Sequence, residues 1–165
     1  MKKVFALLLA LTLCLTAVAA VAETADIPTV AVEAAYEGTP VAIGDTGLTI
    51  SIPSDWALAQ APEGYYFVYT NPENTMSISI QPALGIDACW EAASAMVEAE
   101  TAKDLQEMFV NETYYMVYST ADDLFNFAYA PVTDDSCIAI CFGLVSKDVD
   151  GSIALQILST LAAAE

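Results

Sequence analysis

Residues 137–145, Cys-Ile-Ala-Ile-Cys-Phe-Gly-Leu-Val, decide the fold of this chain. Successive side chains of a β-strand point to opposite faces. One face of this segment would carry large apolar side chains, at Ile138, Ile140, Phe142 and Leu144. The other face would carry small or sulfur-containing ones, at Cys137, Ala139, Cys141 and Gly143. A strand that is apolar on both faces is typical of the middle of a sheet with cover on both sides.

Five further segments have the alternation or the aromatic and β-branched content of strands. They cover residues 48–52, 65–70, 76–81, 113–119 and 125–130. Paired aspartates at 122–123 and 134–135 separate the last three strands, and aspartate favours turns. Pro82 is expected to end the third strand, because proline cannot extend a ladder of hydrogen bonds. These segments predict an antiparallel six-stranded sheet.

Two segments have helical spacing instead. Residues 87–109 repeat apolar side chains every three or four positions, and we expect one long helix or two helices with a kink near Glu100,. Asp150-Gly151 predicts a turn, with Ser152 as the N-cap of a closing helix that runs through Leu161,. Hairpins together with two amphipathic helices indicate an α+β domain in which the helices pack on the sheet.

The order of these elements resembles that of a known family. Ile52-Pro53-Ser54-Asp55-Trp56, which follows the first strand, resembles the opening of PsbP-like domains. The resemblance covers about residues 46–163 and implies an α/β/α sandwich. The same superfamily includes a Ran-binding nuclear import factor and secreted bacterial domains of unknown function. It implies a fold and supplies no catalytic motif, because one fold carries many functions.

The N-terminus has the pattern of a bacterial export signal. Lys2 and Lys3 precede an apolar core, and Ala20-Val21-Ala22 supplies small residues for cleavage before Glu23,. An uncleaved anchor and lipidation at Cys14 are the alternatives. Residues 23–45 show no period and predict an acidic flexible tether, with at most a short strand near Thr29–Val32. We therefore expect a signal peptide over 1–22, a tether over 23–45, and one extracytoplasmic domain over 46–165.

The charge of the chain excludes several kinds of function. The 165 residues contain 22 acidic side chains, four lysine or arginine side chains and no histidine, and the formal net charge is −18. Lys2 and Lys3 would leave with the signal, so 22 acidic groups would face only Lys103 and Lys147, a net charge of −20. Two lysines cannot form a nucleic-acid interface, so no nucleic-acid partner is expected. Without histidine, the usual general base and metal ligand is missing.

Three cysteines remain after the expected cleavage. Cys137 and Cys141 lie four residues apart on one strand, about 13 Å, which is too far for a disulfide. Cys89, near the start of the long helix, could reach either of them. A Cys89 bridge and three free thiols are therefore both left open, whereas a shared metal site is not expected.

The acidic residues suggest two possible activities, glycoside hydrolysis and calcium binding. Two carboxylates can hydrolyse a glycosidic bond, but the paired aspartates fall in turns. Asp148-Val149-Asp150-Gly151 is a fragment of a calcium loop that lacks the further ligands. A carboxylate-based hydrolase acting on glycans or the cell wall, and weak calcium binding, are kept as alternatives.

Aromatic residues give the remaining candidate site. Tyrosine and tryptophan are common in binding surfaces, and Trp56, Tyr65 and Tyr115 are the residues selected as a ligand or partner surface. The sequence thus predicts a non-enzymatic binding or structural module at the cell surface, with an unknown protein or glycan partner. No catalytic residue, cofactor or metal is predicted, and no membrane span is expected after signal cleavage.

Overall fold

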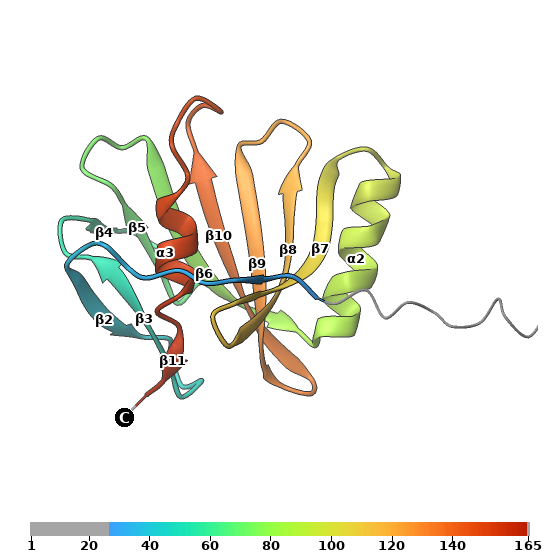
Figure 1. The fold of residues 1–165 in the computed structure, drawn as a ribbon, viewed down its shortest axis with the longest axis horizontal. Helices are drawn as coiled ribbons and strands as arrows, with labels where there is room; N and C mark the ends of the chain where they lie inside the picture. The colour runs from blue at the N-terminus through green and yellow to red at the C-terminus, as the bar shows by residue number, and fades with distance from the viewer. Residues whose placement is uncertain (1–26, 165) are drawn as a thin grey trace, which may run out of the picture.

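The computed structural model describes residues 27–164, which form two sheets and two helices (Figure 1). The strands are β1 (Thr29–Val30), β2 (Gly38–Ala42), β3 (Leu48–Pro53), β4 (Ala57–Ala59), β5 (Phe67–Thr70), β6 (Met76–Leu84), β7 (Ala102–Val110), β8 (Thr113–Thr120), β9 (Phe125–Thr133), β10 (Ser136–Leu144) and β11 (Ala162–Ala163). The helices are α2 (Ile86–Glu98) and α3 (Ile153–Leu158). The predicted signal peptide, 1–22, lies outside the described residues.

The main sheet has eight strands in the order β1-β7-β8-β9-β10-β6-β5-β4. Its neighbouring strands are antiparallel except for β1, which pairs with β7 in parallel. The predicted six-stranded antiparallel sheet was therefore right about the α+β class and wrong about strand number and direction. The predicted first strand, β3, belongs instead to a second sheet in the order β11-β3-β2.

Strand β10 lies between β9 and β6, as its two apolar faces predict. Ile138, Ile140 and Phe142 point into the larger core, which α3 and β3 also line. On the opposite face, α2 packs through Ala93 against a smaller cluster that contains Met116 and Tyr118. The sheet therefore has different cover on its two faces, and both clusters remove apolar surface from water.

The second half of the predicted long helix is a strand. Helix α2 ends because Glu100 adopts φ +57°, and the amide groups of Glu100 and Thr101 donate to Val97 O and Met96 O. This pair of bonds is a Schellman motif, which more often has glycine at the left-handed position. The chain then reverses into β7, which pairs with β8 on both sides of a register shift between Lys103 and Gln106.

Part of the predicted tether is folded. Strand β1 lies where the sequence predicted a short strand, near Thr29–Val32. Strand β2, Gly38–Ala42, was not predicted and pairs with β3. Ile43 is fully buried, and the hydroxyl of Tyr36 donates to Ser51 O at 2.8 Å. The folded domain therefore includes residues 29–45, and its N-terminal segment crosses the same face of the sheet as α3 (Figure 1).

The closing helix is shorter than predicted. Helix α3 ends at Leu158, and Leu161 is buried beyond it in the same core. Ser152 makes no side-chain capping bond; instead its amide donates to Asp150 Oδ1 at 2.9 Å. The fully buried Tyr115 donates its hydroxyl hydrogen to Leu158 O at 2.8 Å, which fixes the end of α3 to the sheet.

We expect Tyr115→Phe to lower the free energy of unfolding by about 1 kcal/mol, the usual net value of one hydrogen bond. The loss is moderate because Leu158 O also accepts from Leu161 N at 3.2 Å. Urea unfolding measures the change, and Tyr114→Phe is the matched control because its hydroxyl bonds to Glu107 on an exposed site. Equal losses in both variants would contradict the role of Tyr115.

Stability should also fall in alkali, in the presence of a reductant. Burial raises the pKa of the Cys137 and Cys141 thiols to about 11 and raises the pKa of the Tyr115 hydroxyl. The unfolded chain therefore loses these protons first, so the free energy of unfolding should be level at neutral pH and decrease above about pH 9. Urea titrations across this range measure the slope, and Tyr115→Phe should make it shallower above pH 10. An unchanged stability up to pH 11 would contradict the burial of these groups.

Candidate functional site

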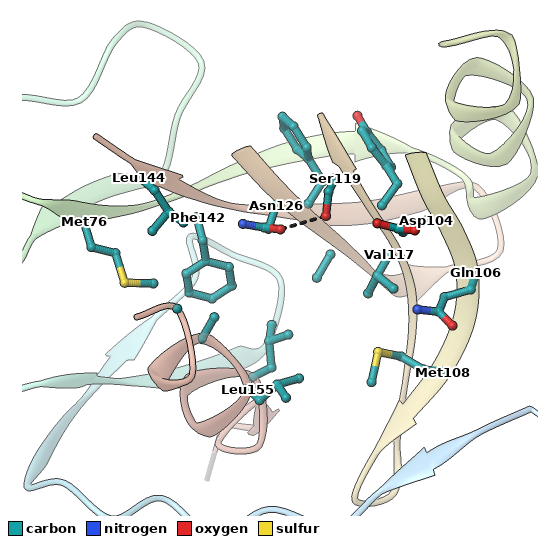
Figure 2. A pocket seen from close by; sticks show the side chains of 16 residues that line it. Met76, Asp104, Gln106, Met108, Val117, Ser119, Asn126, Phe142, Leu144 and Leu155 are labelled. Atoms are coloured by element: carbon teal, nitrogen blue, oxygen red, sulfur yellow. Dashed lines mark hydrogen bonds between the residues drawn. The ribbon is translucent and has the colours of Figure 1, made fainter. Parts of the chain in front are cut away.

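The main candidate site is a groove between α3 and strands β7–β9, with a volume of about 280 Å³ (Figure 2). Apolar side chains form most of its walls: Met76, Met108, Val117, Phe142, Leu144, Leu155 and Leu158. Polar side chains lie at one part of its border: Asp104, Gln106, Ser119 and Asn126. Such a mostly apolar concavity with a few polar groups is typical of a ligand site.

Helix α3 leaves this groove open because it lies to one side of β7–β9 (Figure 1). Its Ala154, Leu155 and Leu158 form one wall, while the neighbouring strands form the floor and the other wall. Residues with little or no side chain, such as Gly151, Ala154 and Ala128, leave room between them. The groove is thus the part of the sheet face that α3 does not cover.

Ser119 and Asn126 form the polar part of the floor. They are register partners on β8 and β9, and the Ser119 hydroxyl donates to Asn126 Oδ1 at 2.7 Å. In Figure 2 the amide nitrogen of Asn126 lies on the side away from Ser119, toward Phe142. The pair therefore presents an N–H donor beside an apolar wall, which suits a ligand with an oxygen acceptor next to an apolar group.

Asp104 reaches the groove because β7 is irregular there. The pairing of β7 with β8 shifts between Lys103 and Gln106, and Asp104 has φ +56°. Such a bulge changes the direction of a side chain, and bulges are frequent beside functional sites. Asp104 is the carboxylate that lines the groove, and its side chain is exposed.

The groove has few groups that could take part in a reaction. Its residues include one carboxylate, a serine whose hydroxyl donates to an amide oxygen, and no cysteine. Nucleophilic catalysis by serine requires an adjacent base. In residues 27–164, no three cysteine or carboxylate side chains lie close enough together to hold a metal ion.

The three aromatic residues selected from the sequence do not form one surface. Trp56 is 8% exposed and Tyr115 is fully buried, so both belong mainly to the core. Tyr65 is half-buried. Tyr115 cannot contact a ligand in this conformation, and the surface predicted from Trp56, Tyr65 and Tyr115 is therefore wrong for that residue.

A stacked aromatic group lies on the opposite, α2 side of the sheet. The rings of Tyr118 and Phe127 stack at 4.8 Å, and Tyr118 and Tyr129 at 6.1 Å. The Tyr118 and Tyr129 hydroxyls are 3.4 Å apart, and burial raises the pKa of both. These rings pack against Ala93 of α2 and support the smaller core.

The aspartates in the turns make local contacts that stabilise those turns. Asp122 accepts from the Thr120 hydroxyl at 2.6 Å and from the Leu124 amide, and these bonds lower its pKa. Asp123 forms an ion pair with Lys103 at 2.7 Å. The amide of Ser152 lowers the pKa of Asp150 in the same way. The Asp150 carboxylate is thus occupied by the turn that the sequence indicated as the alternative to a calcium loop.

Sequence reasoning missed the polar pair in the groove. Asn126 stands between Phe125 and Phe127 in an aromatic strand, which was a usable signal, because a polar residue in such a strand needs a hydrogen-bond partner. The contact between Asn126 and Ser119 depends on the register of β8 and β9, and the groove depends on where α3 lies on the sheet.

Comparison with solved structures shows which known fold this chain has. The solution structure of cyanobacterial PsbP (CyanoP) from Synechocystis sp. PCC 6803 matches 76% of this chain and 91% of that one, with a TM-score of 0.52 and 10% identity. A crystal structure from Bacteroides thetaiotaomicron VPI-5482 matches 78% of this chain, with a TM-score of 0.49 and 21% identity. The chain spans about half, 49%, of the length of that second protein. The chain has a PsbP-like fold, which confirms the resemblance seen in the sequence.

No family model and no curated protein sequence matches the chain. The structural similarities therefore show the fold alone. Within residues 27–164, neither helix has the length and apolar character needed to cross a bilayer.

We expect Asp104→Gly to be at least as stable as the wild type, and Asp104→Ala to be about 1 kcal/mol less stable than Asp104→Gly, because a Cβ is unfavourable at this positive φ. Urea unfolding of the two variants measures the difference. If the alanine variant is as stable as the glycine variant, the bulge that turns Asp104 toward the groove is absent in solution.

Proposed function

We propose that this protein is an exported, non-enzymatic binding module whose ligand site is the groove beside α3. The ligand is an uncharged amphipathic group that places an oxygen acceptor near Asn126 and its apolar part against Phe142 and Leu155. A small molecule and a side chain of a partner protein can both supply this chemistry. The signal-like N-terminus, residues 1–22, supports the export part of the proposal.

One observation carries the proposal: an open apolar groove that contains a hydrogen-bonded polar pair. Apolar area that stays in contact with water is unfavourable, and covering it with a ligand recovers about 25 cal/mol for each Å². The Ser119–Asn126 pair gives orientation, because its donor and acceptor pattern is directional,.

The electrostatics select against anionic ligands. Asp104 lies at the border of the groove, and the chain from Glu23 onward carries a net charge of −20. A field of this sign repels carboxylates and phosphates and slows their association. The ligand we propose is therefore neutral, and a fatty carboxylate should bind more weakly than the corresponding alcohol.

A carboxylate-based hydrolase is the second candidate, supported by a depression beside Trp56. Its lining includes three carboxylates, those of Asp55, Glu73 and Asp150. Asp150 is a poor proton donor at neutral pH, because the hydrogen bonds from Ser152 lower its pKa. Glycan hydrolysis by the wild type that is lost in Glu73→Gln would favour this candidate over the binding module.

Binding is tested with Nile red, a neutral dye whose emission increases in apolar sites. We expect the wild-type protein to bind the dye, and Ala154→Trp to weaken binding at least tenfold because the indole ring fills the groove. Ala95→Trp is the matched control, since Ala95 is an exposed position on α2. 1-Hexanol should displace the dye more effectively than hexanoate.

The proposal would be contradicted if Ala154→Trp unfolds at the same urea concentration as the wild type and still binds the dye with wild-type affinity. Loss of binding in Ala95→Trp alone would place the site on α2 instead. Asn126→Leu keeps the groove open and removes its donor, so it should retain the dye and bind 1-hexanol more weakly than the wild type.

A further inference from the structure

The first turn of α2 lies against the start of β10, on the side of the sheet away from the groove. Ala83 of β6 and Cys137 of β10 are register partners, and α2 begins three residues after Ala83. Gly85 lies so close to the turn before β10 that a Cβ there would be 2.8 Å from Asp134 O. This close approach fixes the position of the helix start relative to β10.

Cys89 lies in this first turn and faces back toward the strand ends. Its thiol donates to Leu84 O at 3.3 Å. The Cys137 thiol lies close enough to Cys89 for each thiol to influence the pKa of the other. Cys137 is 2% exposed, whereas Cys89 is only partly buried. A partly accessible thiol therefore lies near a buried one.

Cys141 is in a different environment. It is four residues from Cys137 on the same strand, about 13 Å away. Burial raises the pKa of the Cys141 thiol, and the side chain of Ser79, its register partner on β6, lowers it. The structure thus distinguishes between the two partners that the sequence left open for Cys89.

We propose that Cys89 and Cys137 are a redox pair that forms a disulfide between α2 and β10, and that Cys141 stays a free thiol. The three thiols are free in the structure. The bridge would fix the first turn of α2 to the central strand of the main sheet.

The chemistry is thiol–disulfide exchange with an external disulfide as the oxidant. The Cys89 thiolate attacks one sulfur of that disulfide, forms a mixed disulfide and releases one external thiolate. The Cys137 thiolate then attacks the Cys89 sulfur and releases the second. Two protein thiols are oxidised, one external disulfide is reduced to two thiols, and the two protons pass to the released thiolates.

The order of attack follows from exposure. Cys89 is only partly buried and can be reached by an external disulfide, whereas Cys137 is buried. Burial also raises the pKa of the Cys137 thiol to about 11, which leaves little thiolate at neutral pH,. Cys137 is therefore the resolving thiol, and it acts on a sulfur that is already adjacent to it.

The test uses the full chain with Cys14→Ser, so that only these three cysteines remain. The protein is incubated with oxidised glutathione, alkylated under denaturing conditions and weighed by mass spectrometry. We expect monomeric protein that has lost two hydrogen atoms and takes up one alkyl group. Cys141→Ser should still form the bridge, whereas Cys89→Ser and Cys137→Ser should not.

Stability gives an independent measurement. Closing the long loop between Cys89 and Cys137 should raise Tm by about 5–15 °C. A reductant should reverse this increase, and Cys89→Ser should not show it. Because Cys89 is partly exposed, this variant should fold even if Cys137→Ser does not.

Three results would overturn the proposal. They are three alkylated cysteines after oxidation, a bridge that persists in Cys137→Ser through Cys141, and a disulfide-linked dimer through Cys89 in place of the internal bridge.

Discussion

The burial of both faces of β10 is the constraint on which the rest of the structure depends. Ile138, Ile140 and Phe142 need one apolar layer, and Cys137 and Ala139 need another. The first layer is built by α3 together with β3 and the segment around Tyr36, and the second by α2. The two layers are unequal in size, so the two faces of the sheet can serve different purposes.

The larger layer is also the incomplete one. Helix α3 covers β10 and is held through the bond from Tyr115 to Leu158 O, and β7 and β8 lie to its side (Figure 1). The uncovered area becomes the groove, with Val117 and Met108 as its apolar floor and wall. The lateral position of α3 on the sheet therefore sets both the core and the space for a ligand.

The strands from residue 113 onward could be predicted because their alternation is regular and their turns contain paired aspartates. Strand β7 could not, because the bulge at Asp104 interrupts the two-residue period and leaves Leu105, Met108 and Phe109 at helical spacing. Its boundary with α2 was also hidden, since Glu100 occupies a position where glycine is the usual signal,. Strand β2 was missed because it is mostly exposed and contains Pro40, as edge strands often do,.

The candidate site was harder to predict than the fold. Tyr115 was selected as an aromatic surface residue, yet the register of β8 turns it into the larger core. Asn126 was passed over, although it lies between two phenylalanines, because its partner Ser119 comes from another strand. Both outcomes depend on which face of a strand is covered, and that is decided by contacts between distant parts of the chain.

The proposed ligand site is the groove beside α3. The most direct test is a backbone amide NMR titration of the protein with 1-hexanol. We expect the shifted signals to belong to the groove, at Ser119, Asn126 and Leu155, while those of α2 remain unchanged. Shifts that gather on α2 or around Trp56, with Ser119 and Asn126 unaffected, would contradict it.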